Sequence, residues 1–321
     1  MEARLDDPDV LAVLDGYRTC EFATVGRNGV PIAWPTSPLY RPGVGLLITT
    51  SIGFPQKAYN VRRNPRVGLL FSDPTGSGLD TMPQVLVQGL ASCPDTVLGS
   101  PAGLEDYWTR LYERQPAGRN YGANPVGRRL MDWYYRRLVI TITPTSVHTR
   151  PPLEPSAPLV TDGRGRHSAS AFGQAADHMS AHRSAVLVAL DGEGSPWLLR
   201  VRPHTDQSES SFMLDVPADE RLVPGPASLL CHSHDERLWK LRSFVVTGHV
   251  SPEQGRWRFT VDRFVAGADG NPFHAVRALR NCQRTARRYL ERRTQSPPGV
   301  EWAEYNAVKD EVVRRETTPS R

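Results

Sequence analysis

The chain has 321 residues, a length that favours two domains, and its ordinary apolar content allows each half to form a core. Its net charge of +5 permits an anionic ligand without requiring nucleic acid. No apolar run reaches the ~18 residues of a membrane span, and the acidic N-terminal segment lacks the apolar core of a signal peptide. The four cysteines show no metal-binding or redox spacing. We therefore expect reduced thiols, no metal site, no membrane partner and a cytoplasmic location.

Local signals in the first half predict short strands joined by turns. Asp7 is the expected N-cap of the first helix. Strands are expected over 21–26 and 30–39, because the Asn-Gly pair between them favours the left-handed backbone of a tight hairpin. Helices are expected over 104–114 and 125–136, and both are rich in aromatic residues. Aromatic residues at helical spacing are typical of a core, and the alternative is a cover over a flat cofactor ring.

The most informative segment runs from 45 to 73. An apolar strand ends in three hydroxyl residues, and a short helix then opens at Pro55 with Lys57 in its first turn. The hydroxyl residues are Thr49, Thr50 and Ser51. Proline suits the first helical position because the N–H that it lacks would be unpaired there. The free N–H groups of a helix start attract phosphate, and a lysine strengthens that attraction. The segment therefore predicts a site for a phosphate-bearing ligand.

This order of strand, hydroxyls, lysine-bearing helix, Asn-Pro-Arg-Val and second strand resembles the split β-barrel of the pyridoxamine 5′-phosphate oxidase-like family. Segments 23–35, 85–91 and 139–147 resemble further strands of that barrel, so the resemblance covers about residues 8–150. The family binds FMN, a deazaflavin or occasionally haem. The resemblance implies a fold that is mainly β with peripheral helices (α+β). The resemblance says little about which reaction is catalysed, because one fold hosts several chemistries.

The resemblance also implies which residues bind the cofactor. Lys57 and the three hydroxyl residues are expected to contact its phosphate. Trp34 and Pro35 lie on the strand that lines the isoalloxazine groove in the family, and core packing is the alternative for Trp34. Gln88 interrupts an apolar strand, and a buried amide needs partners, so its expected role is a hydrogen bond to the flavin. No catalytic residue or general acid can be named. This fits flavin chemistry, in which the cofactor itself transfers the hydride.

The second half appears as a degenerate copy of the first. A proline-rich connector at 151–166 separates the halves, and strand-like segments at 185–196, 227–232 and 244–250 then repeat the earlier order. The segment 216–224 stands where the phosphate helix would be, but it is acidic and has no lysine. The expected organisation is two tandem split β-barrels, at 1–150 (cofactor-binding) and 167–267 (without a phosphate site), followed by C-terminal helices at 268–321.

The C-terminal helices carry arginines on one side. A solvated face is the simple interpretation, and contact with nucleic acid or with an anionic cofactor tail is the alternative. Nucleic acid is not an expected partner, because no recognised nucleic-acid-binding motif is present. Barrels of this family usually pair, with cofactors in the grooves between them. The tandem chain would then form either an internal pseudo-dimer or a homodimer.

The leading functional hypothesis is an FMN-dependent oxidoreductase that moves hydride to or from a small organic substrate. A deazaflavin-dependent reductase is the alternative cofactor assignment. Pyridoxamine phosphate oxidase activity itself is disfavoured, because the residues that would bind that substrate's phosphate cannot be placed. From a different class of protein, the chain could be a non-catalytic carrier or sensor of flavin or haem. The substrate and the electron donor stay open.

Overall fold

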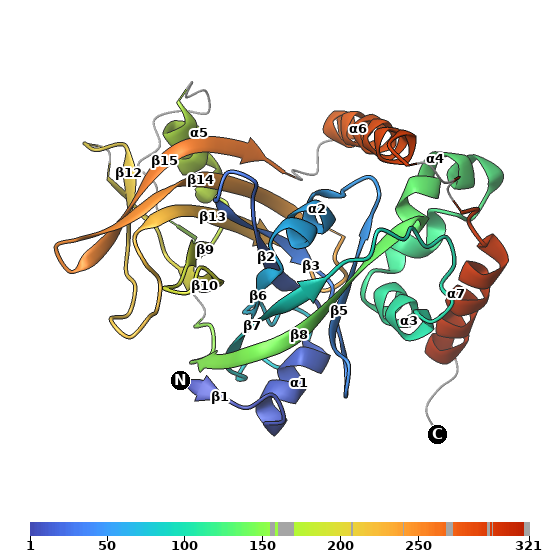
Figure 1. Cartoon of the computed structure of the whole chain (residues 1–321), viewed down its shortest axis with the longest axis horizontal. Coiled ribbons are helices and arrows are strands. Elements are labelled where there is room, and N and C mark those ends of the chain that lie inside the picture. Colours follow the sequence, from blue (N-terminus) through green and yellow to red (C-terminus); the bar gives the residue numbers. More distant parts are fainter. Residues whose placement is uncertain are drawn as a thin grey trace.

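The structure, a computed structural model, contains two curled antiparallel sheets with helices around them (Figure 1). It describes residues 1–154, 158–159, 170–206, 208–239, 241–267, 272–293, 296 and 298–317. The predicted fold class, mainly β with peripheral helices and built from two split barrels, is confirmed. The domain boundaries given above stay predictions, and most of the expected linker at 151–166 lies outside the described residues.

The first sheet has the strand order β3-β2-β6-β7-β8-β5-β4, with β1 paired to β8. Its strands are β1 (Glu2–Ala3), β2 (Cys20–Val25), β3 (Pro31–Thr36), β4 (Leu39–Arg41), β5 (Gly45–Ser51), β6 (Arg66–Phe71), β7 (Gln84–Ser92) and β8 (Arg137–Arg150). The second sheet has the order β10-β9-β13-β14-β15-β12-β11. Its strands are β9 (Ala185–Leu190), β10 (Pro196–Val201), β11 (His204–Asp206), β12 (Ser211–Leu214), β13 (Gly225–Ser233), β14 (Arg242–Glu253) and β15 (Arg256–Ala266).

The two sheets share strand order, register and one irregularity. The hairpin β2–β3 begins its pairing at Cys20 and Thr36, and β9–β10 does so at the matching ends, Ala185 and Val201. The ladder β7–β8 shifts register after Gln88, immediately before a glycine, and β14–β15 shifts in the same place after Thr247. A bulge at the same place in both sheets is a specific feature of the fold rather than an accident of pairing. The second half is therefore a structural repeat of the first.

The repeat differs where the phosphate helix stands. In the first barrel α2 (Gln56–Arg63) connects β5 to β6, whereas 215–224, all of them described, contain no helix between β12 and β13. The other helices are α1 (Pro8–Gly16), α3 (Glu105–Arg114), α4 (Pro125–Tyr135), α5 (Ala171–Met179), α6 (Pro272–Glu291) and α7 (Trp302–Thr317), with a 3-10 turn at Pro116–Asn120. Asp7 caps α1 as predicted, because its carboxylate accepts the Asp9 N–H. Among the helices described, none is long and apolar enough to cross a membrane.

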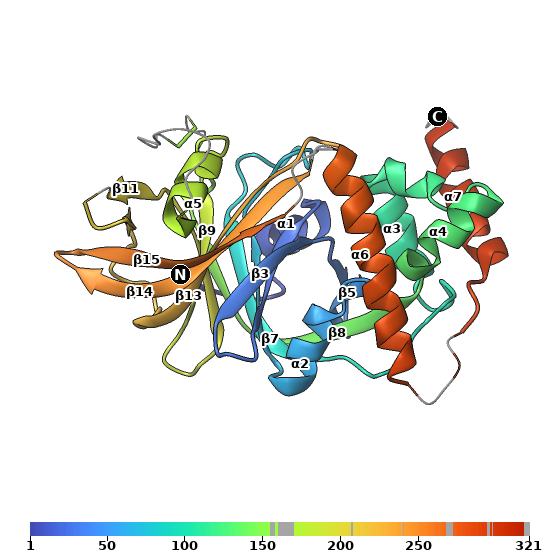
Figure 2. The same ribbon diagram turned by 90° about the horizontal axis from the view of Figure 1, so that it is seen from above.

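The aromatic helices form a separate apolar cluster beside the first barrel. α3, α4 and α7 lie together beside the first barrel (Figure 1). They pack around Trp108, whose ring lies against Tyr112, Tyr135 and Tyr305. Figure 2 shows α6 beside α4, and its buried face enters the core of the first barrel. The burial of Trp108 confirms core packing for this side chain.

The two sheets pack against each other within one chain. Small side chains of the first sheet, Ala23 and Ala33 among them, belong to the apolar core of the second. At Gly68 the approach is closest, since a Cβ there would lie 2.5 Å from Leu198 Cδ1 and 2.8 Å from the Pro196 carbonyl. The structure therefore contains the internal pseudo-dimer. A homodimer of such chains stays a prediction.

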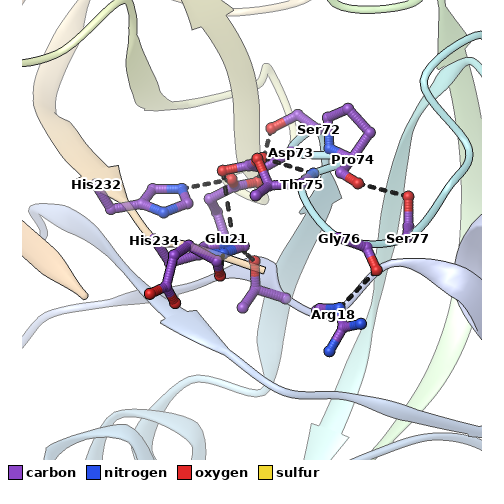
Figure 3. A network of polar contacts seen from close by, with 12 residues as sticks. Arg18, Glu21, Ser72, Asp73, Pro74, Thr75, Gly76, Ser77, His232 and His234 are labelled. Carbon is purple, nitrogen blue, oxygen red and sulfur yellow. Dashed lines mark hydrogen bonds and ion pairs between the residues drawn. The ribbon is translucent and has the colours of Figure 1, made fainter. Parts of the chain in front are cut away.

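A buried polar network crosses this contact. Arg200 on β10 donates to Glu21 on β2 at 2.6 Å, and both side chains are at most 5% exposed. His232 Nε2 lies 2.7 Å from the same carboxylate, and Ser72 donates to it at 3.0 Å (Figure 3). Burial acts to raise the pKa of Glu21, but Arg200 and His232 outweigh it and hold that pKa below its usual value.

The Glu21→Gln variant should be strongly destabilised, because it leaves the Arg200 guanidinium buried without its counter-charge. Breaking a buried pair in this way costs about 3–5 kcal/mol. Urea unfolding measures it, with Arg4→Gln, which removes an exposed ion pair with Asp6, as the control that should leave stability unchanged. Equal stability of Glu21→Gln and the wild type would show that apolar packing alone joins the barrels.

Candidate functional site

A cavity of about 280 Å³ lies where β5 meets α2, between the first barrel, the aromatic helices and the β13–β14 loop of the second barrel. Its volume is at the lower end of small-molecule sites. It is lined by Thr19, Pro35, Thr36, Ser37, Thr49, Thr50, Ser51, Phe54, Lys57, Tyr107, Leu111, Gln115, Tyr134, Arg137, Leu238 and Leu241. Five of the seven residues predicted from the sequence to bind a cofactor are in this set: Pro35, Thr49, Thr50, Ser51 and Lys57.

The hydroxyl residues at the end of β5 all reach the cavity. Strand alternation alone would turn only some of them towards it, but Ser51 is the last residue of the strand and the chain turns there. Thr50 Oγ1 donates to the Phe54 carbonyl at 2.8 Å, which fixes the turn into α2. Thr49 Oγ1 is buried and forms no hydrogen bond with any described residue. An unpaired buried hydroxyl is costly, so Thr49 is suited to a ligand.

Lys57 is half-buried at the start of α2 and projects into the cavity. Its Nζ lies 5.3 Å from the centre of the Trp34 ring, and it forms no ion pair with a residue that the structure describes. Burial, together with the nearby Arg137, lowers the pKa of Lys57 to about 8. Keeping Lys57 charged therefore costs free energy, and a bound anion would offset that cost.

Arg137, the first residue of β8, is a second cation that sequence analysis missed. Its side chain is 7% exposed, and its guanidinium carbon lies 4.1 Å from the Tyr134 ring centre and 4.9 Å from that of Trp108. Its Nε and Nη2 are buried, and no described residue accepts a hydrogen bond from either. Its neighbour Arg136 instead pairs with Asp132 outside the cavity. No local signal in the sequence distinguishes these two adjacent arginines.

The charged side chains that line the cavity are all positive. Two cations and several hydroxyls line it, and its described lining includes no aspartate or glutamate. The remaining wall is apolar or aromatic, formed by Phe54, Leu111, Tyr107, Leu238 and Leu241. Such a site suits a ligand that has an anionic group at one end and a flat or apolar body at the other.

The other two predicted residues lie elsewhere. Trp34 stands beside Lys57 but lines a neighbouring hollow rather than this cavity. Gln88 donates to Asp191 at 2.8 Å and to the Pro196 carbonyl at 3.2 Å, and it accepts from Ser146. Its amide thus joins the first barrel to the β9–β10 turn. Cofactor contacts by Trp34 and Gln88 stay predictions.

The second barrel supplies residues that no sequence signal indicated, and the aromatic helices supply two tyrosines that belong to the set considered above as a cover over a cofactor ring. Leu238 and Leu241 reach the cavity from the β13–β14 loop, and Leu238 adopts a φ of 55°, which is strained for a non-glycine residue. On α3 and α4 the tyrosines Tyr107 and Tyr134 face the cavity. These contacts arise from packing between distant segments, which periodicity does not encode.

Comparison with known proteins finds similar chains only among solved structures. No family model and no curated protein matches the chain. A putative pyridoxamine 5′-phosphate oxidase from Listeria innocua is 22% identical, covers 46% of this chain and 98% of its own, and has a TM-score of 0.31. An F420 reductase is 19% identical over 43% of this chain and 94% of its own, with a TM-score of 0.29. A haem storage protein from Vibrio cholerae is 15% identical over 46% and 95%, with a TM-score of 0.32. At these scores, none of the three assigns a ligand or a reaction to this chain.

The amine of Lys57 should lose its proton near pH 8 in the ligand-free protein, well below an ordinary lysine, because burial and Arg137 disfavour its charge. Competitive acylation followed by peptide mass spectrometry measures the midpoint of its reactivity against pH. Lys309, which pairs with Asp310 on α7, is the internal control for a lysine outside the cavity. Coinciding midpoints would contradict the description of the cavity as a cationic, water-poor site.

Proposed function

We propose that the cavity binds the phosphate end of a flavin-type cofactor, FMN in the first place, and that the protein is an oxidoreductase acting on a small organic substrate. The observation that carries the proposal is the pair Lys57 and Arg137. Arg137 is buried and Lys57 is half-buried, and neither has an acidic partner among the described residues. Buried charges are normally paired, so this arrangement supports an anionic ligand as the missing partner.

The residues around the pair fit a phosphate group. Lys57 offers an ammonium and Arg137 a planar guanidinium with free N–H groups, while Thr49 and Ser51 add hydroxyls. Charge-assisted hydrogen bonds of this kind are roughly twice as strong as neutral ones. The start of α2 contributes backbone N–H groups that also favour an anion. The sequence motif and the geometry therefore support the same ligand chemistry.

The opposite wall fits a planar ring system. Tyr107, Tyr134 and Phe54 present aromatic surface, and Phe54 is more than half exposed, so the ring end would remain open to a substrate. A bound flavin would supply hydride transfer itself. The chain's own residues would then hold the phosphate, cover one part of the ring and exclude water from the rest.

A deazaflavin with a phosphate in the same position is the alternative cofactor, since Lys57 and Arg137 recognise charge rather than the ring. A non-catalytic carrier or sensor of flavin or haem is the alternative function. The absorption spectrum of the purified protein and the mass of its released ligand distinguish these cases. A flavin spectrum supports FMN, a Soret band supports haem, and a deazaflavin is identified by its mass.

The Lys57→Met and Arg137→Gln variants should each weaken FMN binding about 10- to 150-fold, corresponding to the ~1.5–3 kcal/mol of a hydrogen bond to a charged group. Fluorescence titration of the apoprotein measures the dissociation constants. Arg136→Gln is the matched control, because it removes the adjacent guanidinium, which lies outside the cavity. Wild-type affinity in both cavity variants would overturn the phosphate assignment.

The reduced holoprotein should pass its electrons to at least one class of organic acceptor faster than to oxygen. Stopped-flow mixing with quinones, enals and pyridoxal compounds tests this, with free reduced FMN at equal concentration as the control. An enzyme accelerates the reaction by positioning the reactants. If no acceptor reacts faster with the protein than with free FMN, the carrier or sensor function is favoured.

A further inference from the structure

A histidine of the second barrel reaches the edge of the cavity through one hydroxyl. His234 follows β13, and its side chain is fully buried at the contact between the barrels (Figure 3). Its Nε2 lies 3.2 Å from Thr19 Oγ1, and Thr19 is itself a buried lining residue of the cavity. Thr19 therefore connects the cavity on one side with an imidazole on the other.

The tautomer of His234 follows from its second nitrogen. Nδ1 lies 3.0 Å from the Asp235 carbonyl oxygen, which can only accept, so Nδ1 carries a hydrogen and donates it. In the neutral ring Nε2 is then an acceptor, and the Thr19 hydroxyl donates to it. In the charged ring Nε2 becomes a donor, and the hydroxyl is free to donate into the cavity. The direction of the Thr19–His234 bond thus depends on the charge of the imidazole.

His234 also has a route to solvent on its far side. Asp73 Oδ2 lies 3.5 Å from Nε2, and both residues line a second cavity of about 500 Å³, which exposed Asp80, Glu154 and Arg183 border. Protons can reach Asp73 and His234 from that side without entering the first cavity. The two cavities are thus connected by Asp73, His234 and Thr19.

We infer that Thr19 and His234 form a proton relay that serves the ligand in the first cavity, with Asp73 and the second cavity as its connection to solvent. The inference rests on the proposed function, because it assigns the source of the proton that accompanies hydride transfer. It gives the second barrel, which lacks a phosphate helix, a part in the reaction of the first. Thr19 is the residue that borders the ligand, and His234 acts through it.

The proton transfer is balanced as follows. When the substrate takes a hydride and then needs a proton, Thr19 Oγ1 gives up its hydrogen and at the same time takes the one on His234 Nε2. The imidazolium becomes a neutral imidazole that keeps Nδ1–H on the Asp235 carbonyl. A proton arriving by way of Asp73 then restores the charged ring. The reverse order removes a proton from the ligand.

Charged groups lie close to His234. Asp73 is the nearest of them and comes from the β6–β7 loop. His232 stacks beside it at 6.3 Å between ring centres with 20° between the planes, and is itself held by Glu21. Arg200 stands behind that pair and is bonded to Glu21 rather than to His234. The nearest charge to His234 is thus a carboxylate, which can exchange a proton with Nε2.

Variants of Thr19 and His234 test the relay in two measurements. The first needs no turnover. Selective ¹⁵N labelling of histidine records the Nε2 signal of His234 with and without FMN, with His234→Gln used for assignment. Binding of FMN should shift this signal, because a Thr19 hydroxyl that donates to the ligand accepts a hydrogen bond from Nε2 instead of donating to it. Thr19→Val, which keeps the shape and loses the hydroxyl, should abolish this shift, and Thr19→Ser should keep it.

The second measurement is the pH profile of single-turnover reoxidation by an acceptor that the wild type reduces. Thr19→Val and His234→Gln should be about 100-fold slower at pH 6.5, a typical contribution of general acid catalysis, and should lose the pH dependence of the wild type. Thr19→Ser should retain the wild-type profile. Identical behaviour of Thr19→Val and Thr19→Ser in both measurements overturns the relay alone. Failure of the wild type to bind any flavin or deazaflavin overturns the proposed function and the relay with it.

Discussion

The ion pair between Glu21 and Arg200 fixes how the two barrels pack against each other. It lies where water is excluded, so its geometry has little freedom, and the loss of either partner would leave an unpaired charge. Arg200 also donates to Ser72, which follows β6, and to Ser184, which precedes β9, so the ends of these strands are linked to β2 and β10 at one point. The β13–β14 loop follows directly from His232 of this network, and that loop supplies His234, Leu238 and Leu241. The β13–β14 loop, which forms part of the cavity wall, thus depends on an ion pair that lies outside the cavity.

The two halves have the same framework and different chemistry at equivalent positions. Arg200 occupies on β10 the place that Pro35 has on β3, and His232 occupies the place of Ser72 after β6, as the matching registers show. Where the first barrel has a cavity with free cations, the second has paired charges. The absence of a helix from 215–224 removes the lysine position altogether. The two halves of the pseudo-twofold arrangement therefore differ: the first barrel holds the cationic cavity, and the second barrel holds paired charges that support it.

Sequence analysis succeeded where the determining interactions are local. The strand order of the repeat, the cap at Asp7 and the position of Lys57 follow from turn residues, periodicity and helix-start chemistry within a few residues. It missed Arg137 and Thr19 because their roles depend on which distant segments meet. Gln88 shows the same limit, since the buried amide found its partners in the opposite barrel. A single polar residue in an apolar strand indicates burial and a partner, but it does not identify that partner.

The cationic cavity also has a consequence for stability. A lysine whose pKa is lower in the folded chain than in the unfolded chain binds fewer protons when folded, so stability rises as pH increases through the interval between the two values. Below pH 8 the folded protein therefore carries the cost of charging Lys57 beside Arg137. A bound anion removes that cost and adds its own binding free energy to the folded state. Under the proposed function, the phosphate of the ligand would therefore stabilise the fold as well as occupy the site.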